Sequence, residues 1–288
     1  MIRNVTLALF IGLLFLSCNK TEEKIIGDNN PPADNTIPAS LRINFINKIY
    51  ISLLGREPET TEFNDADLSL RNSNFSIASR KTIVQEILNQ DGFLDREFEI
   101  YRNDLMSGVD TAEISELITT FEFLLTNSTY MQQWPLIEIE KARLISLRNV
   151  SAELKDGTIS LTEMQRRCVD NFYFDQLNMG SLNFVIACFQ NLLLRNPTEF
   201  EESEGVKIVD GFNGILFLQT GESKDQFQQI FFQSDNYYAG QIKLNFLRFM
   251  LRLPNSEEEV YFSSRLKSEG NIKSVLIDLL SSDEYAGI

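Results

Sequence analysis

Apolar residues recur every three or four positions over most of the chain, which is the spacing of one face of an α-helix. The pattern starts after Ser40, with apolar residues four positions apart at Leu41, Phe45, Ile49 and Leu53. The same spacing predicts four more helices further along, at 98–106, 112–125, 136–151 and 161–177. No run alternates apolar and polar residues as a strand does. We therefore predict an all-α protein of roughly nine to twelve helices.

Three segments share one plan, in which an apolar helical run ends in Arg-x-Pro and a glutamate follows four positions after the proline. They are 49–62 (IYISLLGREPETTE), 189–201 (FQNLLLRNPTEFE) and 246–258 (FLRFMLRLPNSEE). The aligned residues are Arg56, Pro58 and Glu62 in the first, Arg195, Pro197 and Glu201 in the second, and Arg252, Pro254 and Glu258 in the third. A residue before proline is biased away from α-helical conformation, so each segment predicts a helix that stops and a second that starts.

The arginine at the end of one helix and the glutamate at the start of the next can pair across the turn. An anion site is the other interpretation of these arginines. We favour a structural role, because three copies in one chain are typical of a folding device.

Each segment is followed, after a variable stretch, by Ser or Gln, then Asp, any residue and an aromatic residue. These signatures are QDGF at 90–93, SDNY at 234–237 and SDEY at 282–285. We therefore predict repeated helix-turn-helix modules that end in this signature. The first module occupies 41–94, a helical bridge follows at 95–180, and the second and third modules occupy 181–288.

The modules resemble a known type of extracellular bacterial domain. The run Tyr-x-x-Leu-Leu-Gly-Arg-x-Pro at 50–58, followed by the closing aromatic signature, is similar to an extracellular domain of unknown function that is related to phycobilisome linker domains and to domains that accompany planctomycete-type cytochromes. The resemblance implies an assembly or accessory role and supplies no catalytic residues. A cytochrome itself would need Cys-x-x-Cys-His, which this chain lacks.

The first 17 residues have the pattern of a signal peptide, with Arg3 ahead of an apolar stretch from Val5 to Leu16. The sequence Phe-Leu-Ser-Cys that ends at Cys18 resembles a bacterial lipobox, which implies lipidation of Cys18. Two other interpretations remain open: an uncleaved membrane anchor, and an ordinary signal peptide with an incidental cysteine. The apolar stretch is short for a span, which takes about 20 residues.

Residues 18–40 are polar and contain three prolines, so we expect a flexible tether. Within them, KTEE at 20–23 resembles the short export signal of Bacteroidetes-type envelope lipoproteins. The resemblance implies a lipid-anchored protein of the outer membrane. Whether it faces the periplasm or the cell surface stays open, because a plain solvated spacer would have the same composition.

Charge and composition exclude several partners and chemistries. The chain has 26 basic and 41 acidic residues and a formal charge of −15, which disfavours nucleic acid as a partner. Without any histidine, histidine-based triads and histidine metal ligation are absent. We expect no metal site and no cofactor, since the chain also lacks Cys-x-x-Cys.

Two thiols remain after Cys18, at Cys168 and Cys188. They could form a disulfide in an oxidising envelope, or they could be two small buried side chains. The sequence leaves both interpretations open.

An enzyme would have to use the carboxylates. A paired-carboxylate glycosidase needs two acids held across a cleft, and sequence alone cannot place them. The acidic candidates are Glu138, Glu140, Glu199, Glu201, Glu202, Glu204 and Glu257 to Glu259. We expect a non-catalytic interaction or assembly module with an envelope or secreted protein partner. The alternative is an accessory glycan-binding or glycan-cleaving lipoprotein, which a cleft with Trp134 and two facing carboxylates would favour.

Overall fold

The structure is a computed structural model that describes residues 38–288. The predicted signal peptide, Cys18 and nearly all of the predicted tether lie outside the described residues. Among the residues that are described, no helix combines the length and the apolar character that crossing a membrane requires.

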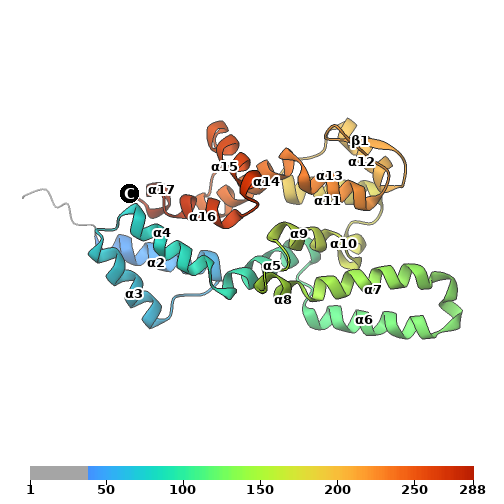
Figure 1. Cartoon of the computed structure of the whole chain (residues 1–288), viewed down its shortest axis with the longest axis horizontal. Coiled ribbons are helices and arrows are strands. Elements are labelled where there is room, and N and C mark those ends of the chain that lie inside the picture. Colours follow the sequence, from blue (N-terminus) through green and yellow to red (C-terminus); the bar gives the residue numbers. More distant parts are fainter. Residues whose placement is uncertain (1–37) are drawn as a thin grey trace, which may run out of the picture. The chain divides into compact units, whose positions relative to one another are not determined.

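The described chain is mostly helical, as predicted, but it has more helices than the hydrophobic spacing indicated (Figure 1). Its 16 α-helices are α2 (Ala39–Leu54), α3 (Thr60–Asn72), α4 (Ile77–Leu88), α5 (Asp91–Met106), α6 (Thr111–Thr126), α7 (Trp134–Arg148), α8 (Val150–Lys155), α9 (Leu161–Val169), α10 (Phe172–Leu177), α11 (Ser181–Leu193), α12 (Glu199–Val209), α13 (Lys224–Gln233), α14 (Asp235–Asn245), α15 (Ser256–Glu269), α16 (Ile272–Leu280) and α17 (Asp283–Ala286). A 3₁₀ turn, η1 (Ser128–Gln133), joins α6 to α7, and a π-helical turn, η2 (Phe246–Met250), follows α14.

The helix predicted at 161–177 is in fact two helices, α9 and α10. The side chain of Asn171 accepts hydrogen bonds from the backbone N–H groups of Tyr173 and Phe174, at 3.0 and 3.1 Å. An asparagine that caps a helix in this way starts a new helix, because its side chain replaces the missing backbone acceptor. The apolar spacing continues across the break and therefore hid it.

A small antiparallel hairpin, which the sequence analysis missed, is formed by β1 (Gly214–Leu216) and β2 (Gln219–Gly221). Its two turn residues, Phe217 and Leu218, both have positive φ angles, of 49° and 64°. Turns of this kind normally carry Asn-Gly or a similar pair. Neither turn residue gave that signal, so the hairpin could not be predicted.

Two hydrophobic cores hold these helices together. One is formed by α2, α3, α4 and the start of α5 with the end of α14, η2, α15, α16 and α17. The other is formed by α5 to α14 and includes the hairpin residue Leu216. The third Arg-x-Pro segment thus shares a core with the first, although the second segment lies between them in the sequence. Helix α14 also packs on α11, which belongs to the other core.

Candidate functional site

The three Arg-x-Pro segments make the same set of contacts. In each, the guanidinium group donates two hydrogen bonds to the carboxylate six residues later. The nitrogen to oxygen distances are 2.6 and 2.7 Å for Arg56 with Glu62, 2.7 and 2.7 Å for Arg195 with Glu201, and 2.8 and 2.7 Å for Arg252 with Glu258. In each, one carboxylate oxygen also accepts a hydrogen bond from a backbone N–H at the start of the following helix, at 2.8 Å.

The residues around each arginine are also equivalent. The residue before it has a left-handed backbone, with φ of 69° at Gly55, 55° at Leu194 and 58° at Leu251. The aromatic residue six positions earlier lies under the guanidinium, and the distances from the guanidinium carbon to the ring centroid are 5.7 Å for Tyr50, 4.9 Å for Phe189 and 5.1 Å for Phe246. These contacts occupy most of the donors of each arginine.

The closing signatures lie at helix starts. Ser234 and Ser282 each accept a hydrogen bond from the backbone N–H of the aromatic residue three positions later, at 3.1 and 3.2 Å. The aromatic rings of Phe93, Tyr237 and Tyr285 are buried. In two cases the residue before the aromatic contacts the segment's own arginine. Arg195 donates to Asn236 at 3.1 Å, and Arg252 pairs with Glu284 at 2.6 Å.

The glutamates that pair with these arginines have lowered pKa values. Hydrogen bonds from Arg56, Arg195 and Arg252 are the largest cause for Glu62, Glu201 and Glu258 respectively. The carboxylates are therefore held ionised and already coordinated. An incoming anion would have to displace a bidentate partner, so this geometry favours the structural interpretation over an anion site.

Cys168 and Cys188 are both free and buried. Burial raises the pKa of each thiol, which keeps both protonated and unreactive. No group of three or more acidic or thiol ligands that could hold a metal ion occurs within residues 38–288.

The other acidic and aromatic candidates are dispersed. Trp134 is at the start of α7, where its ring N–H donates to the carbonyl oxygen of Leu124 at 3.1 Å. Glu140 pairs with Arg143 at 2.8 Å, Glu204 with Lys207 at 2.5 Å and Glu259 with Lys243 at 3.3 Å. Within residues 38–288, the Trp134 side chain is thus bonded within its own hairpin, and each of these three carboxylates is paired with a cation.

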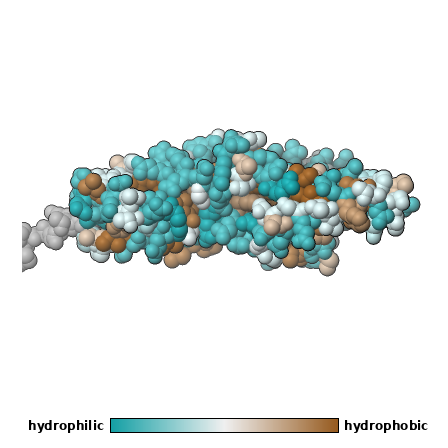
Figure 2. Space-filling view, turned by 90° about the horizontal axis from the view of Figure 1, so that it is seen from below, coloured by the Kyte–Doolittle hydropathy of each residue, from teal (hydrophilic) through white to brown (hydrophobic). Residues whose placement is uncertain are grey.

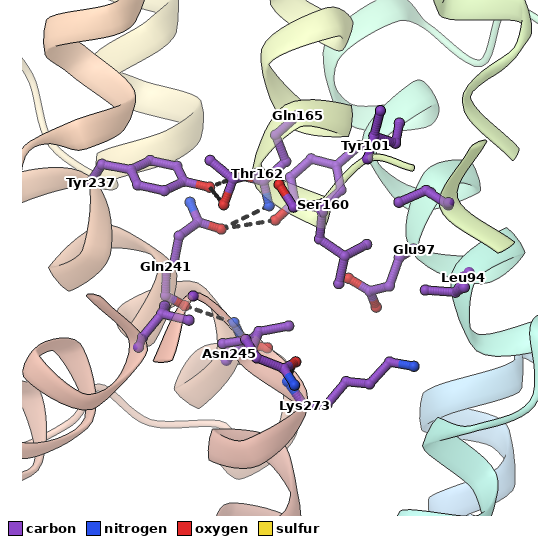
Figure 3. Close-up of a pocket in the computed structure, with 17 residues that line it drawn as sticks. Leu94, Glu97, Tyr101, Ser160, Thr162, Gln165, Tyr237, Gln241, Asn245 and Lys273 are labelled. Atoms are coloured by element: carbon purple, nitrogen blue, oxygen red, sulfur yellow. Dashed lines mark hydrogen bonds between the residues drawn. The ribbon is translucent and has the colours of Figure 1, made fainter. Parts of the chain in front are cut away.

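A polar pocket that the sequence analysis did not predict lies where the two cores adjoin. Its volume is about 190 Å³, and its wall contains residues of α5, α8, α9, α14, α15 and α16. Figure 3 shows Tyr237, Gln165, Gln241 and Tyr101 along the upper part of the pocket, and Asn245 and Lys273 along the lower part.

Amide and phenol groups form a connected hydrogen-bond network in this wall. The hydroxyl groups of Tyr101 and Tyr237 donate to Gln241 and Gln165, at 3.1 and 2.6 Å, and the amide of Gln165 donates to Gln241 at 2.9 Å. Burial raises the pKa of both tyrosines, so they stay protonated as donors. A satisfied network of this kind fixes the positions of its side chains.

Two charged residues also line the pocket, and their situations differ. Glu97 is nearly buried and forms an ion pair with Arg248 at 2.5 Å. Lys273, in the first turn of α16, forms no ion pair with any described carboxylate, and its ammonium lies 5.6 Å from the centroid of the Phe93 ring. Desolvation lowers the pKa of Lys273.

The sequence did contain a signal for this site. Gln165 and Gln241 occupy helix positions where the apolar spacing calls for a core residue, and both are buried. A buried amide needs partners, so such a position indicates a polar network. Which residues would supply the partners could not be predicted, since Gln165 and Gln241 are 76 residues apart.

Comparison with protein family models, with curated proteins and with solved structures gave no match.

Proposed function

We propose that this chain is a lipid-anchored cell-envelope protein that acts as a non-catalytic interaction or assembly module. The signal-peptide pattern of the first 17 residues, the lipobox-like sequence that ends at Cys18 and the resemblance of the predicted modules to linker domains support this proposal. The anchor would hold the protein at the outer membrane through Cys18. The observation that carries the interaction role is the hairpin of α6 and α7.

The outer part of the α6–α7 hairpin has no core of its own. No residue from 119 to 143 is buried. The hairpin contributes to the core formed by α5 to α14 only at its base, through residues such as Ile118 and Leu144. Exposed apolar side chains occupy this region: Phe123 at 66%, Met131 at 56%, Leu136 at 67% and Ile139 at 50% exposure. Figure 2 shows hydrophobic side chains, in brown, at several places on this face, among them the half of the molecule where α6 and α7 lie in Figure 1.

The outer part of this hairpin also lacks charge, in a protein that is acidic as a whole. Residues 123–137 contain no charged side chain, although 23% of the chain is charged. An exposed apolar surface of this kind is typical of a protein interaction site. We propose that it binds an uncharged apolar surface on another envelope or secreted protein.

The test is an affinity pull-down of the lipid-anchored protein from membrane extract, compared with two matched leucine variants. Leu136→Ser changes the hairpin, while Leu218→Ser changes a leucine that is 98% exposed at the tip of the β-hairpin. The proposal requires a partner in stoichiometric amount that is lost with Leu136→Ser and retained with Leu218→Ser. Equal recovery by both variants would contradict it, and so would concentration-dependent self-association as the only effect of the hairpin.

The anchor has its own test. Cys18→Ser should move the protein from the membrane fraction to the soluble fraction, while protease shaving of intact cells tells whether the anchored protein faces outward. A Cys18→Ser protein that stays in the membrane fraction would contradict lipid anchoring.

A second candidate function is an accessory glycan-binding lipoprotein, and the polar pocket is the observation that favours it. Amide and phenol groups are suitable partners for sugar hydroxyl groups. Cleavage is less well supported, because Glu97 is the only carboxylate in the pocket wall and a glycosidase needs two.

A further inference from the structure

We propose that the pocket between the two cores binds a single-ring sugar acid, with the carboxylate of the ligand at Lys273 and its hydroxyl groups at the amide and phenol groups of α5, α9 and α14. This inference rests on the second candidate function, and it is independent of the α6–α7 hairpin surface.

The volume of the pocket limits the size of its ligand. The pocket has a volume of about 190 Å³. Sites for drug-sized ligands are larger, at about 300–1,000 Å³. The pocket is therefore suited to a ligand of about one sugar ring and would not enclose an oligosaccharide.

The hydrogen-bond network in the pocket wall holds its polar groups in place. Gln165, Gln241, Tyr101 and Tyr237 are held by one another, so their orientations are fixed before a ligand arrives. Asn245 is anchored below them by a hydrogen bond from its amide to the carbonyl oxygen of Gln241, at 2.7 Å, which leaves its side-chain oxygen to accept from a ligand. Such preorganisation reduces the entropy that a ligand loses on binding to polar groups.

The charges in and around the pocket wall favour an anionic ligand. The ion pair of Glu97 with Arg248 is neutral as a unit, so Lys273 leaves the pocket wall with one uncompensated positive charge in a chain of net charge −15. Asp91 also acts on the charge of Lys273, but it forms no ion pair with it. A partly buried ammonium without a counter-ion favours an anionic ligand, because a carboxylate would restore the charge-assisted hydrogen bonds that the ammonium lost with its water.

The start of α16 strengthens this preference. Asn271, Ile272 and Lys273 all line the pocket, and Asn271 is the residue that caps the helix. The amino end of a helix carries a partial positive charge that favours anions and disfavours a cation such as Lys273. A lysine in this place therefore has no stabilising role through the helix dipole.

The experiment is a calorimetric titration of the purified full-length protein with sodium glucuronate and, in parallel, with glucose. These probes have the same ring and differ in the carboxylate, which glucose replaces with a hydroxymethyl group. We expect glucuronate to bind at least about tenfold more tightly than glucose, which is the range of a hydrogen bond to a charged group.

Two variants complete the test. Lys273→Met keeps most of the side-chain volume and removes the charge, and it should weaken glucuronate binding by about tenfold or more with no loss of thermal stability. Lys207→Met makes the same change of net charge at an exposed lysine outside the pocket and should bind like the wild type.

The possible outcomes distinguish the sugar-acid inference from the glycan-binding candidate. Equal binding of glucose and glucuronate, or wild-type affinity in Lys273→Met, overturns the role of the carboxylate but keeps a glycan-binding pocket. Failure of both probes to bind overturns the sugar-acid inference together with the glycan-binding candidate. A third titration, with sodium acetate, tests the hydroxyl groups, because acetate has the carboxylate without the ring. Acetate that binds as tightly as glucuronate overturns the part played by the hydroxyl groups.

Discussion

Arg80 of α4 forms an ion pair with Asp283 at the start of α17, across 203 residues of sequence. The arginine side chain is 1% exposed, while that of the aspartate is 59% exposed. The guanidinium also donates to two backbone carbonyl oxygens, of Ser281 at 2.9 Å and of Phe75 at 3.1 Å. This one side chain therefore links α4 to the C-terminal end of the chain, at Ser281 and Asp283.

Replacing Arg80 should be severely destabilising. In Arg80→Met the carbonyl oxygens of Phe75 and Ser281 lose their donor in a buried place, at a cost of about 1–3 kcal/mol for each. We expect the free energy of unfolding to fall by about 3 kcal/mol in urea titrations followed by far-UV circular dichroism. The matched control is Arg71→Met. That arginine pairs with Asp67 on the surface and is 61% exposed, so its loss should cost less than about 1 kcal/mol. Similar losses in both variants would contradict the assignment.

The arginines of the Arg-x-Pro segments should affect stability, with a size that depends on exposure. Arg56 is 42% exposed, so Arg56→Ala should lower the free energy of unfolding by about 1 kcal/mol, as for a good surface pair. Arg252 pairs with Glu258 and also with Glu284, and we expect Arg252→Ala to cost more. Thermal melts of both variants measure this order. An unchanged melting temperature together with lost partner binding would show a binding role in place of a structural one.

Local features of the chain were predictable, and long-range ones were not. The Arg-x-Pro turns follow from neighbouring residues, and so does the start of α9, where the Oγ of Ser160 accepts from the backbone N–H of Glu163 at 3.1 Å. Arg80 gave no signal, because a charged residue in a helix is ordinarily expected on the surface and its partners are far away in sequence. The same reason applies to the pocket, whose wall combines six helices.

Low pH should lower the stability of the folded state, because it protonates the carboxylates that pair with arginines. The folded-state pKa of Glu258 is lowered, chiefly by its hydrogen bonds with Arg252. Such a group stabilises the folded state fully above its unfolded pKa, about 4.3, and the contribution disappears as the pH falls through the lower folded value. We expect the urea midpoint of the wild type to fall between about pH 5 and pH 3. Glu258→Gln should start from a lower midpoint near pH 7 and fall less steeply. Parallel curves for the two proteins would mean that this pair does not contribute to the acid sensitivity.

Replacing Leu251 with glycine should stabilise the protein. Leu251 has a left-handed backbone, with φ of 58°, and its side chain is 84% exposed, so little burial would be lost. The left-handed conformation costs an L-residue about 1–2 kcal/mol, and glycine loses about 0.5–1 kcal/mol more chain entropy on folding. The expected net gain in Leu251→Gly is about 0.5–1 kcal/mol, measured as a higher melting temperature.

Gly55 occupies the equivalent position in the first segment and provides the reverse test. Gly55→Ala should lower the melting temperature, since a Cβ there would also meet the Arg96 side chain at 3.0 Å.

The close packing of α14 on α11 depends on Gly240. A Cβ at this position of α14 would lie 2.3 Å from the carbonyl oxygen of Leu192 and 2.8 Å from the Cα of Leu193. These are backbone atoms of α11 and its end, and they cannot move without separating the helices. Since overpacking of a core costs about 1–3 kcal/mol or more, Gly240→Ala should lower the free energy of unfolding by at least about 2 kcal/mol.

Gly92 provides the matched control for Gly240. It lies in the first turn of α5, and a Cβ there would meet only the Leu54 side chain, at an ordinary contact distance of 3.5 Å. Alanine is the better helix former, by up to about 1 kcal/mol, so Gly92→Ala should be neutral or stabilising. Gln241, next to Gly240, is part of the pocket network, so displacement of α14 should also weaken glucuronate binding in Gly240→Ala and leave it unchanged in Gly92→Ala. If Gly240→Ala were as stable as Gly92→Ala, the close contact of α14 with α11 would be wrong.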